Sequence, residues 1–233
     1  MVITMKKAVL FFIVVLLVIG VCGCDMKRES KQDIMLNYIN EKYDDTFTFK
    51  SVFGGSAGSN TKKIIVTSGK FPGEDVYVVC TEIDGIQTFT DNYLGVKFAN
   101  KTKETLSAQI EQCFGKNFYL SYIPANLACT ENGSDQTTFE QYVAEESSFI
   151  SFEAIVTGSI SDSDKDAIIE KIKTAFSNMS AIGRIYFVND VVDFTAENGR
   201  DLFVSCVERK EYSHELYFKC NVNNGITIKE WTE

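Results

Sequence analysis

The chain has 233 residues, a formal net charge of −9, seven cysteines and two prolines. This length suits one large domain or two small ones, and 45 % apolar residues with 12 % aromatics indicate a folded core rather than a disordered chain. The arginines are few and scattered and the balance is acidic. These features argue against nucleic acid as a partner, because phosphate binding needs clustered basic side chains.

The first 24 residues have the pattern of a secretory signal. Lys6 and Lys7 form a short basic region, an uncharged apolar run covers residues 8–21, and Asp25 is the first acidic residue. The run is shorter than the about 20 apolar residues of a membrane-spanning helix. The pattern predicts a signal peptide at residues 1–23. The lysines would hold the N-terminus inside, so the rest of the chain is expected outside the cytoplasm.

The residues Val21-Cys22-Gly23-Cys24 resemble the lipobox of bacterial lipoproteins. In that family an aliphatic residue lies three positions before a lipidated cysteine, and a small residue lies one position before it. The resemblance implies that Cys24 carries a lipid and that residues 24–29 are a short lipid-anchored linker on the extracytoplasmic face of the cell membrane. Removal of residues 1–23 would change the net charge to −11. An uncleaved anchor helix and an ordinary secretory signal are the alternatives.

Residues 30–124 are predicted to form a first α+β module. Ser30 and Asp33 have the spacing of a capping box at the start of a helix. Turn residues at Pro72-Gly73 and Asp84-Gly85 separate runs of β-forming residues. We predict helices at 31–43 and 90–114 and strands at 46–53, 63–68, 75–82, 86–89 and 117–123. The apolar stripe of the second helix is interrupted at 100–105, so two shorter helices are an alternative.

Residues 125–138 are polar and contain glycine, and we predict a linker there, followed by a second α+β module at 139–233. Asn198-Gly199 and Asn224-Gly225 are typical of hairpin turns. We predict helices at 139–145 and 161–178 and strands at 149–157, 184–188, 191–195, 201–207, 215–222 and 226–231. A short helical turn at 191–195 is an alternative.

Strands grouped between helices, without steady β–α alternation, predict the α+β class: two small modules of antiparallel sheet with packed helices. The first module loosely resembles helix–meander–helix modules in small secreted Firmicutes proteins of unknown function. The resemblance lies in this layout and in Asp91-Asn92-Tyr93 before the long helix. It implies no activity.

Two motifs were compared with the loops that bind nucleotides and calcium. The Gly-rich segment 54–58 lacks the Gly-Lys-Ser/Thr ending of a phosphate loop and leads into a strand. Asp162, Asp164 and Asp166 alternate as in a calcium loop, but Ala167 and Lys173 stand where that loop needs glycine and glutamate. We therefore expect no cofactor and no metal, and we interpret the acids as residues that favour a helix N-terminus.

His214 is the single histidine, and its surroundings are typical of a surface turn, so no catalytic residue is predicted. The cysteines after Cys24 are Cys80, Cys113, Cys129, Cys206 and Cys220. Their odd number leaves at least one without an internal disulfide partner, and the absence of a CxxC motif argues against a thioredoxin-like role.

These observations favour a non-catalytic binding or interaction module at the cell envelope, attached to the membrane through Cys24 and contacting an envelope protein. An envelope hydrolase that uses a carboxylate pair is one alternative, since the 32 acidic residues allow many pairs. An inhibitor or immunity-type protein that blocks a basic target is the other.

Overall fold

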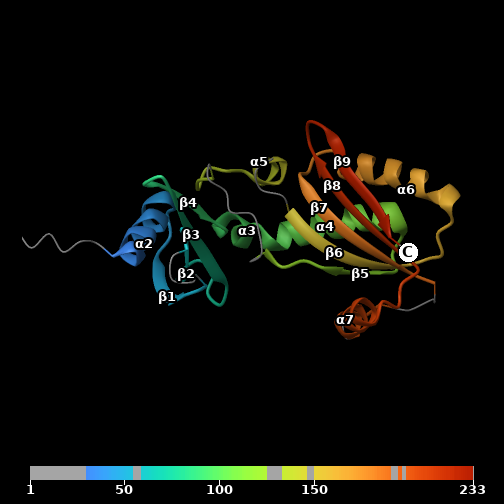
Figure 1. Cartoon of the computed structure of the whole chain (residues 1–233), viewed down its shortest axis with the longest axis horizontal. Helices are drawn as coiled ribbons and strands as arrows, with labels where there is room; N and C mark the ends of the chain where they lie inside the picture. The colour runs from blue at the N-terminus through green and yellow to red at the C-terminus, as the bar shows by residue number, and fades with distance from the viewer. Residues whose placement is uncertain are drawn as a thin grey trace, which may run out of the picture. The chain divides into compact units, whose positions relative to one another are not determined.

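A computed structural model describes residues 30–54, 59–124, 133–145, 150–189, 194–195 and 198–232. Residues 35–233 form one compact unit. The first half contains α2 (Lys31–Lys42), β1 (Phe47–Val52), β2 (Thr61–Ser68), β3 (Asp75–Ile83), β4 (Ile86–Asp91), α3 (Tyr93–Lys97) and α4 (Ala99–Phe114) (Figure 1). The second half contains β5 (Phe118–Ser121), α5 (Phe139–Ala144), β6 (Ile150–Thr157), α6 (Asp162–Ala175), β7 (Ala181–Val188), α7 (Gly199–Arg209), β8 (His214–Asn221) and β9 (Gly225–Thr232).

The predicted α+β class is confirmed. One sheet has the order β1-β2-β3-β4, the other has the order β5-β6-β7-β8-β9, and helices pack on both. The first sheet is wholly antiparallel. The second is mixed, because α6 returns the chain so that β7 lies parallel to β6. A crossover helix is the usual way to join parallel neighbours, and the grouping of elements in the sequence did not predict this pair.

The predicted hairpin around Asn198-Gly199 is wrong. Residues 199–209 form α7, and Asn198 precedes its first turn. Gly199 is needed here for close packing, because a Cβ at this position would lie 2.3 Å from the ring of Tyr119. The predicted strand at 201–207 is wrong as well, because Leu202, Phe203, Cys206 and Val207 follow the spacing of a helix.

The predicted long helix at 90–114 is divided into α3 and α4, the alternative that the interrupted stripe left open. At the start of α2, Ser30 and Asp33 form the predicted capping box, in which Asp33 N donates to Ser30 Oγ and Ser30 N donates to Asp33 Oδ2. The predicted turn at Asp84-Gly85 is present, with both φ angles positive as a type I′ hairpin requires.

The main hydrophobic core contains α2, α4 and α6 and one face of each sheet. On the five-stranded sheet this face carries Phe152, Ile185 and Phe218, which pack against Phe176, the C-cap of α6, and against the buried stripe of α4. A second, smaller cluster lies on the opposite face of that sheet, under α7. Figure 1 shows α7 on the other side of the sheet from α6.

A buried carboxylate joins α2 to the end of β4. Asp91 is fully buried and accepts bonds at both oxygens: Oδ2 from Lys42 Nζ (2.7 Å) and the Tyr38 hydroxyl (3.0 Å), Oδ1 from the Tyr43 hydroxyl and Tyr93 N (both 3.0 Å). The side chain of Lys42 is only 12 % exposed. A buried charge is tolerated when it is paired and its lone pairs are satisfied, as here.

Removing one partner of this pair would leave the other charge uncompensated. We expect Lys42→Met and Asp91→Ala each to lower the free energy of unfolding of the full chain by about 3–5 kcal/mol. Lys50→Met is the control, because Lys50 pairs with Asp75 at the surface, where its side chain is 51 % exposed, and surface pairs contribute about 0–1 kcal/mol. Urea unfolding measures all three. Equal losses for Lys42→Met and Lys50→Met would contradict this account.

Candidate functional site

The face of the five-stranded sheet that carries α7, called the α7 face below, is the candidate site. Alternation along β7 turns Ile185 and Phe187 toward the main core and Arg184 and Tyr186 toward the α7 face. The pairing register brings Glu153 of β6 opposite Arg184. On the neighbouring strand β8, Tyr217 lies opposite Arg184 and Glu215 lies opposite Tyr186.

Helix α7 covers only part of the α7 face. Phe203 and Cys206 of the helix are buried with Ile155, Tyr186 and Val188 of the sheet. The next row along the strands is polar and partly exposed: the side chains of Glu153 and Arg184 are 41 % and 44 % exposed. The face therefore has a covered apolar half and an open polar half.

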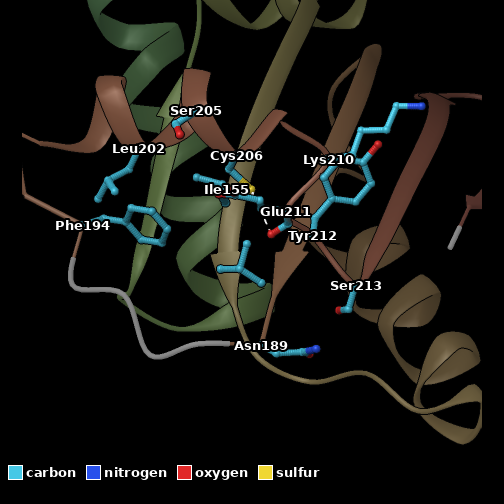
Figure 2. Close-up of a pocket in the computed structure, with 11 residues that line it drawn as sticks. Ile155, Asn189, Phe194, Leu202, Ser205, Cys206, Lys210, Glu211, Tyr212 and Ser213 are labelled. Carbon is cyan, nitrogen blue, oxygen red and sulfur yellow. Dashed lines mark hydrogen bonds between the residues drawn. The ribbon is translucent and has the colours of Figure 1, made fainter. Parts of the chain in front are cut away.

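A cavity of about 490 Å³ lies beside α7. Ile155, Phe194 and Leu202 give it an apolar side, while Ser205, Tyr212 and Ser213 supply hydroxyl groups (Figure 2). Ile155 comes from β6, Leu202 and Ser205 come from α7, and Tyr212 and Ser213 come from the segment after it. The cavity has the size and mixed lining typical of small-ligand pockets.

Cys206 also lines this cavity, and its thiol donates to the carbonyl oxygen of Glu211 at 3.4 Å (Figure 2). Burial raises the pKa of the Cys206 thiol, and the negative charge of Glu211 raises it further. A thiol in such surroundings stays protonated near neutral pH and is a poor nucleophile. The cysteine is therefore part of the wall of the cavity and not a reactive group.

A second, open depression of about 370 Å³ lies on the uncovered half of the α7 face. Its lining includes Ser121, Ser151, Glu153, Ile182, Arg184 and Tyr217. The guanidinium of Arg184 lies 5.8 Å from the centre of the Tyr217 ring, within the range of a cation–π contact. Apolar, aromatic and charged groups are thus presented together on an ordered sheet surface.

A network of polar side chains connects the two depressions. Arg184 pairs with Glu215 (Nε to Oε1, 3.1 Å) and with Glu153 (Nη1 to Oε1, 3.9 Å). The Tyr186 hydroxyl donates to Glu153 at 3.4 Å, and the Tyr212 hydroxyl donates to Glu215 at 3.2 Å. Because Tyr212 lines the cavity beside α7 and Arg184 lines the open depression, a ligand at one would act on the same network as a ligand at the other.

The network changes the proton affinities of its members. The hydrogen bond with Tyr186 raises the pKa of Arg184, burial opposes this rise, and the charges of Glu215 and Glu153 add to it. Burial raises the pKa of Tyr186 to about 12, with the two glutamates adding to the rise and Arg184 opposing it. Arg184 is therefore cationic and Tyr186 neutral at any physiological pH.

The segment after α7 has an unusual backbone. Lys210 adopts a left-handed conformation (φ 56°) at the helix end. Glu211 N donates to Cys206 O at 2.9 Å and Lys210 N to Val207 O at 3.3 Å, the two bonds of a Schellman motif. Glycine is the usual residue at this position, and a lysine there carries a steric cost. The strained residue lies in the wall of the cavity, where such conformations are often functional.

The residue predicted to carry the lipid, Cys24, lies outside the described residues, as does most of the Gly-rich segment 54–58. Among the helices of the described residues, none combines the length and the apolar character needed to cross a membrane. In the same part of the chain, no three side chains of the ligating types come together as a metal site would require.

The alternating acids lie at the start of α6, where Ser161 N donates to Asp164 Oδ2 at 2.9 Å in a capping box. A hydrogen bond from Ser161 lowers the pKa of Asp164, and one from Lys165 lowers that of Asp162. Asp162 and Asp164 are thus acidic residues of the first turn of α6, where a negative charge is favourable. His214 is the first residue of β8, partly exposed, with its ring edge-on to Trp231 at 6.5 Å.

The described cysteines are buried, and Cys113, Cys206 and Cys220 are free thiols. Cys220 lies on β8, as the predicted strand at 215–222 implies, whereas Cys206 lies on α7 and not on the predicted strand at 201–207. Burial raises the pKa of Cys113 and of Cys220 to about 11. These three residues act as small apolar side chains of the core.

The chain was compared with family models, curated proteins and solved structures. No family model matches the chain, and no curated protein matches it. Among solved structures, the crystal structure of a DUF5037 family protein from Ruminococcus gnavus matches with a TM-score of 0.38 and 12 % identity, over 85 % of this chain and 95 % of that chain.

The left-handed lysine gives a test of strain at the cavity. Replacing Lys210 with glycine removes the steric cost, and we expect the free energy of unfolding to rise by about 0.5–1 kcal/mol. Asp84→Gly at the other left-handed non-glycine residue is the control, with a smaller expected rise because aspartate tolerates this conformation better. Thermal and urea unfolding measure both. A loss of stability for Lys210→Gly would show that the lysine side chain stabilises this segment.

Proposed function

We propose that this chain is a lipid-anchored protein of the extracytoplasmic membrane face that binds an envelope partner through the α7 face. The proposed anchor is supported by the basic start, the apolar run and the lipobox-like residues that end at Cys24. The cell membrane is then the first partner, contacted through the lipid, and the envelope protein is the second.

The open half of the α7 face carries this proposal. Arg184 and Tyr217, two residue types enriched among those that dominate binding energies, lie in contact on a surface that no described helix covers. Ion pairs with Glu153 and Glu215 hold Arg184 in place before any partner arrives. A preorganised arginine loses less side-chain entropy on binding than a free one.

The same geometry favours binding over carboxylate-pair hydrolysis. A glycosidase-type mechanism needs one carboxylic acid and one carboxylate facing across a substrate. Glu153, which lines the open depression, and Glu215, which does not line it, share the guanidinium of Arg184 between them. Both are used to hold Arg184, which suits recognition of a partner.

The face also differs from what an inhibitor of a basic target would present. By register, Arg184 and Lys219 share this side of the sheet with Glu153, Glu215 and Glu230, so the face carries charges of both signs and not a uniformly acidic surface. Such a surface recognises its partner by shape and short-range contacts, and we expect binding to depend weakly on salt.

The anchor is tested by metabolic labelling with an alkyne-modified palmitate. We expect the wild-type chain and the Cys22→Ala control to incorporate the label, because Cys22 is removed with the signal peptide. Cys24→Ala should incorporate none, since it lacks the modified sulfur. Label retained in Cys24→Ala, or lost in Cys22→Ala, would contradict the anchor at Cys24.

The binding face is tested in cells by a photo-crosslinking amino acid placed at position 217. We expect a discrete adduct with an envelope protein, and at least about a tenfold weaker adduct when Arg184→Ala is added, as for a residue that dominates binding. The control position is Thr48, an exposed residue of β1 in the other sheet. The same adduct from both positions, or one indifferent to Arg184→Ala, would count against this face.

A further inference from the structure

The hairpin of β3 and β4 ends in a pair of exposed isoleucines. Ile83 and Ile86 face each other across the strands as the last pair of the ladder, and they are 62 % and 72 % exposed. The type I′ turn at Asp84-Gly85 joins them directly. Large apolar side chains are thus presented together at the end of a hairpin, where neither is buried by the fold.

The position of this tip is set by an ordered base. The β3–β4 ladder runs without interruption from Val78 opposite Asp91 to Ile83 opposite Ile86. At its base, the buried Asp91 is held by Lys42 of α2. The hairpin is therefore a stiff projection of the first sheet, and its tip cannot fold back to bury the isoleucines.

Helix α2 lies along β4, with its N-terminal end nearer to this tip than its C-terminal end. Tyr43, at its C-terminal end, packs against Tyr93, which follows β4. Five residues earlier, Tyr38 stacks on Phe89, which is nearer to the turn. The part of α2 that begins at Met35 therefore points with its N-terminal end toward the hairpin end of the sheet.

The reach of the preceding chain limits how far this end can lie from a membrane. Ten residues lie between Cys24 and Met35, so eleven Cα–Cα steps join them. Even fully extended they span at most about 40 Å, whatever their course. With a lipid on Cys24, this reach keeps Met35 near the bilayer and allows the end of the sheet toward which α2 points to lie against the lipid surface.

We propose that Ile83 and Ile86 insert into the surface of the bilayer that holds the lipid anchor. This inference rests on the proposed lipidation of Cys24. Apolar side chains held at an interface are stabilised by burial among the acyl chains. The two positive charges of Lys62 and Lys63 on β2 are equal in number to the two negative charges of Glu82 and Asp84 on the hairpin. The proposed contact between the tip and the bilayer is therefore apolar and not electrostatic. Asp84 limits the depth of insertion, because its carboxylate must stay hydrated.

The test uses the full chain as it is isolated from the cells that produce it, mixed with vesicles of phosphatidylcholine and phosphatidylglycerol, with and without brominated acyl chains that quench tryptophan. Ile86→Trp reports on the tip. Val204→Trp on α7 is the matched control, because Val204 is also an exposed aliphatic residue, at 42 %. The native Trp231 contributes equally to both. We expect bromine to lower the added emission of Ile86→Trp at least about twofold and to leave that of Val204→Trp unchanged.

Two further variants sharpen the result. Asp84→Asn should increase quenching of Ile86→Trp, since the amide tolerates the left-handed turn and needs less hydration. Ile83→Ser should decrease quenching, with little change in the thermal unfolding temperature because Ile83 is exposed.

Flotation of the same vesicles separates the two proposals. If the chain floats with the vesicles but Ile86→Trp is quenched no more than Val204→Trp, membrane contact by the tip is overturned and the anchor stands. If the chain does not float, the lipid anchor is overturned, and the tip proposal falls with it. Quenching confined to Ile86→Trp in floated chain supports both.

Discussion

The buried pair of Lys42 and Asp91 is the interaction on which the first half of the structure depends. It joins α2 to the last strand of the four-stranded sheet, and two tyrosine hydroxyls and a backbone amide satisfy the remaining oxygen sites of Asp91. A buried ion pair is a weak source of net stability but a strong source of specificity, because any other placement of α2 would leave a charge unpaired in the core. Through this pair a single aspartate fixes the orientation of α2 against the base of the β3–β4 hairpin.

The sequence predicted most of the secondary structure but not the arrangement of the second sheet. Alternation and turn residues located the strands of both halves, and the capping boxes at Ser30 and Ser161 located two helix starts. At Asn198-Gly199 the sequence predicts a turn, because Asn-Gly is typical of one, whereas Gly199 is required by the ring of Tyr119, a residue distant in sequence. Such a contact exists only in the folded chain, so no local pattern predicts it.

The candidate site was not predicted for a related reason. Glu153, Arg184 and Glu215 each occupy an ordinary polar position of a half-exposed strand, and nothing in their spacing marks them. They meet because β7 lies between β6 and β8, and the parallel pairing of β6 with β7 sets which residues are opposite. The sheet thus separates two tasks: its inner face packs against α4 and α6, and its α7 face, only partly covered, is left for recognition.

The strand order has a consequence for how the chain can fold. In both sheets each strand pairs with the strand that comes next in sequence, from β1 to β4 and again from β5 to β9. Among the described residues, the connections within the first sheet and between β8 and β9 contain no helix, whereas those from β5 to β8 contain α5, α6 and α7. Short connections keep the entropic cost of pairing low and favour rapid folding, so the first sheet and the β8–β9 hairpin have the lowest cost. A chain delivered N-terminus first could therefore complete the four-stranded sheet, and then extend the five-stranded one strand by strand, without waiting for distant partners.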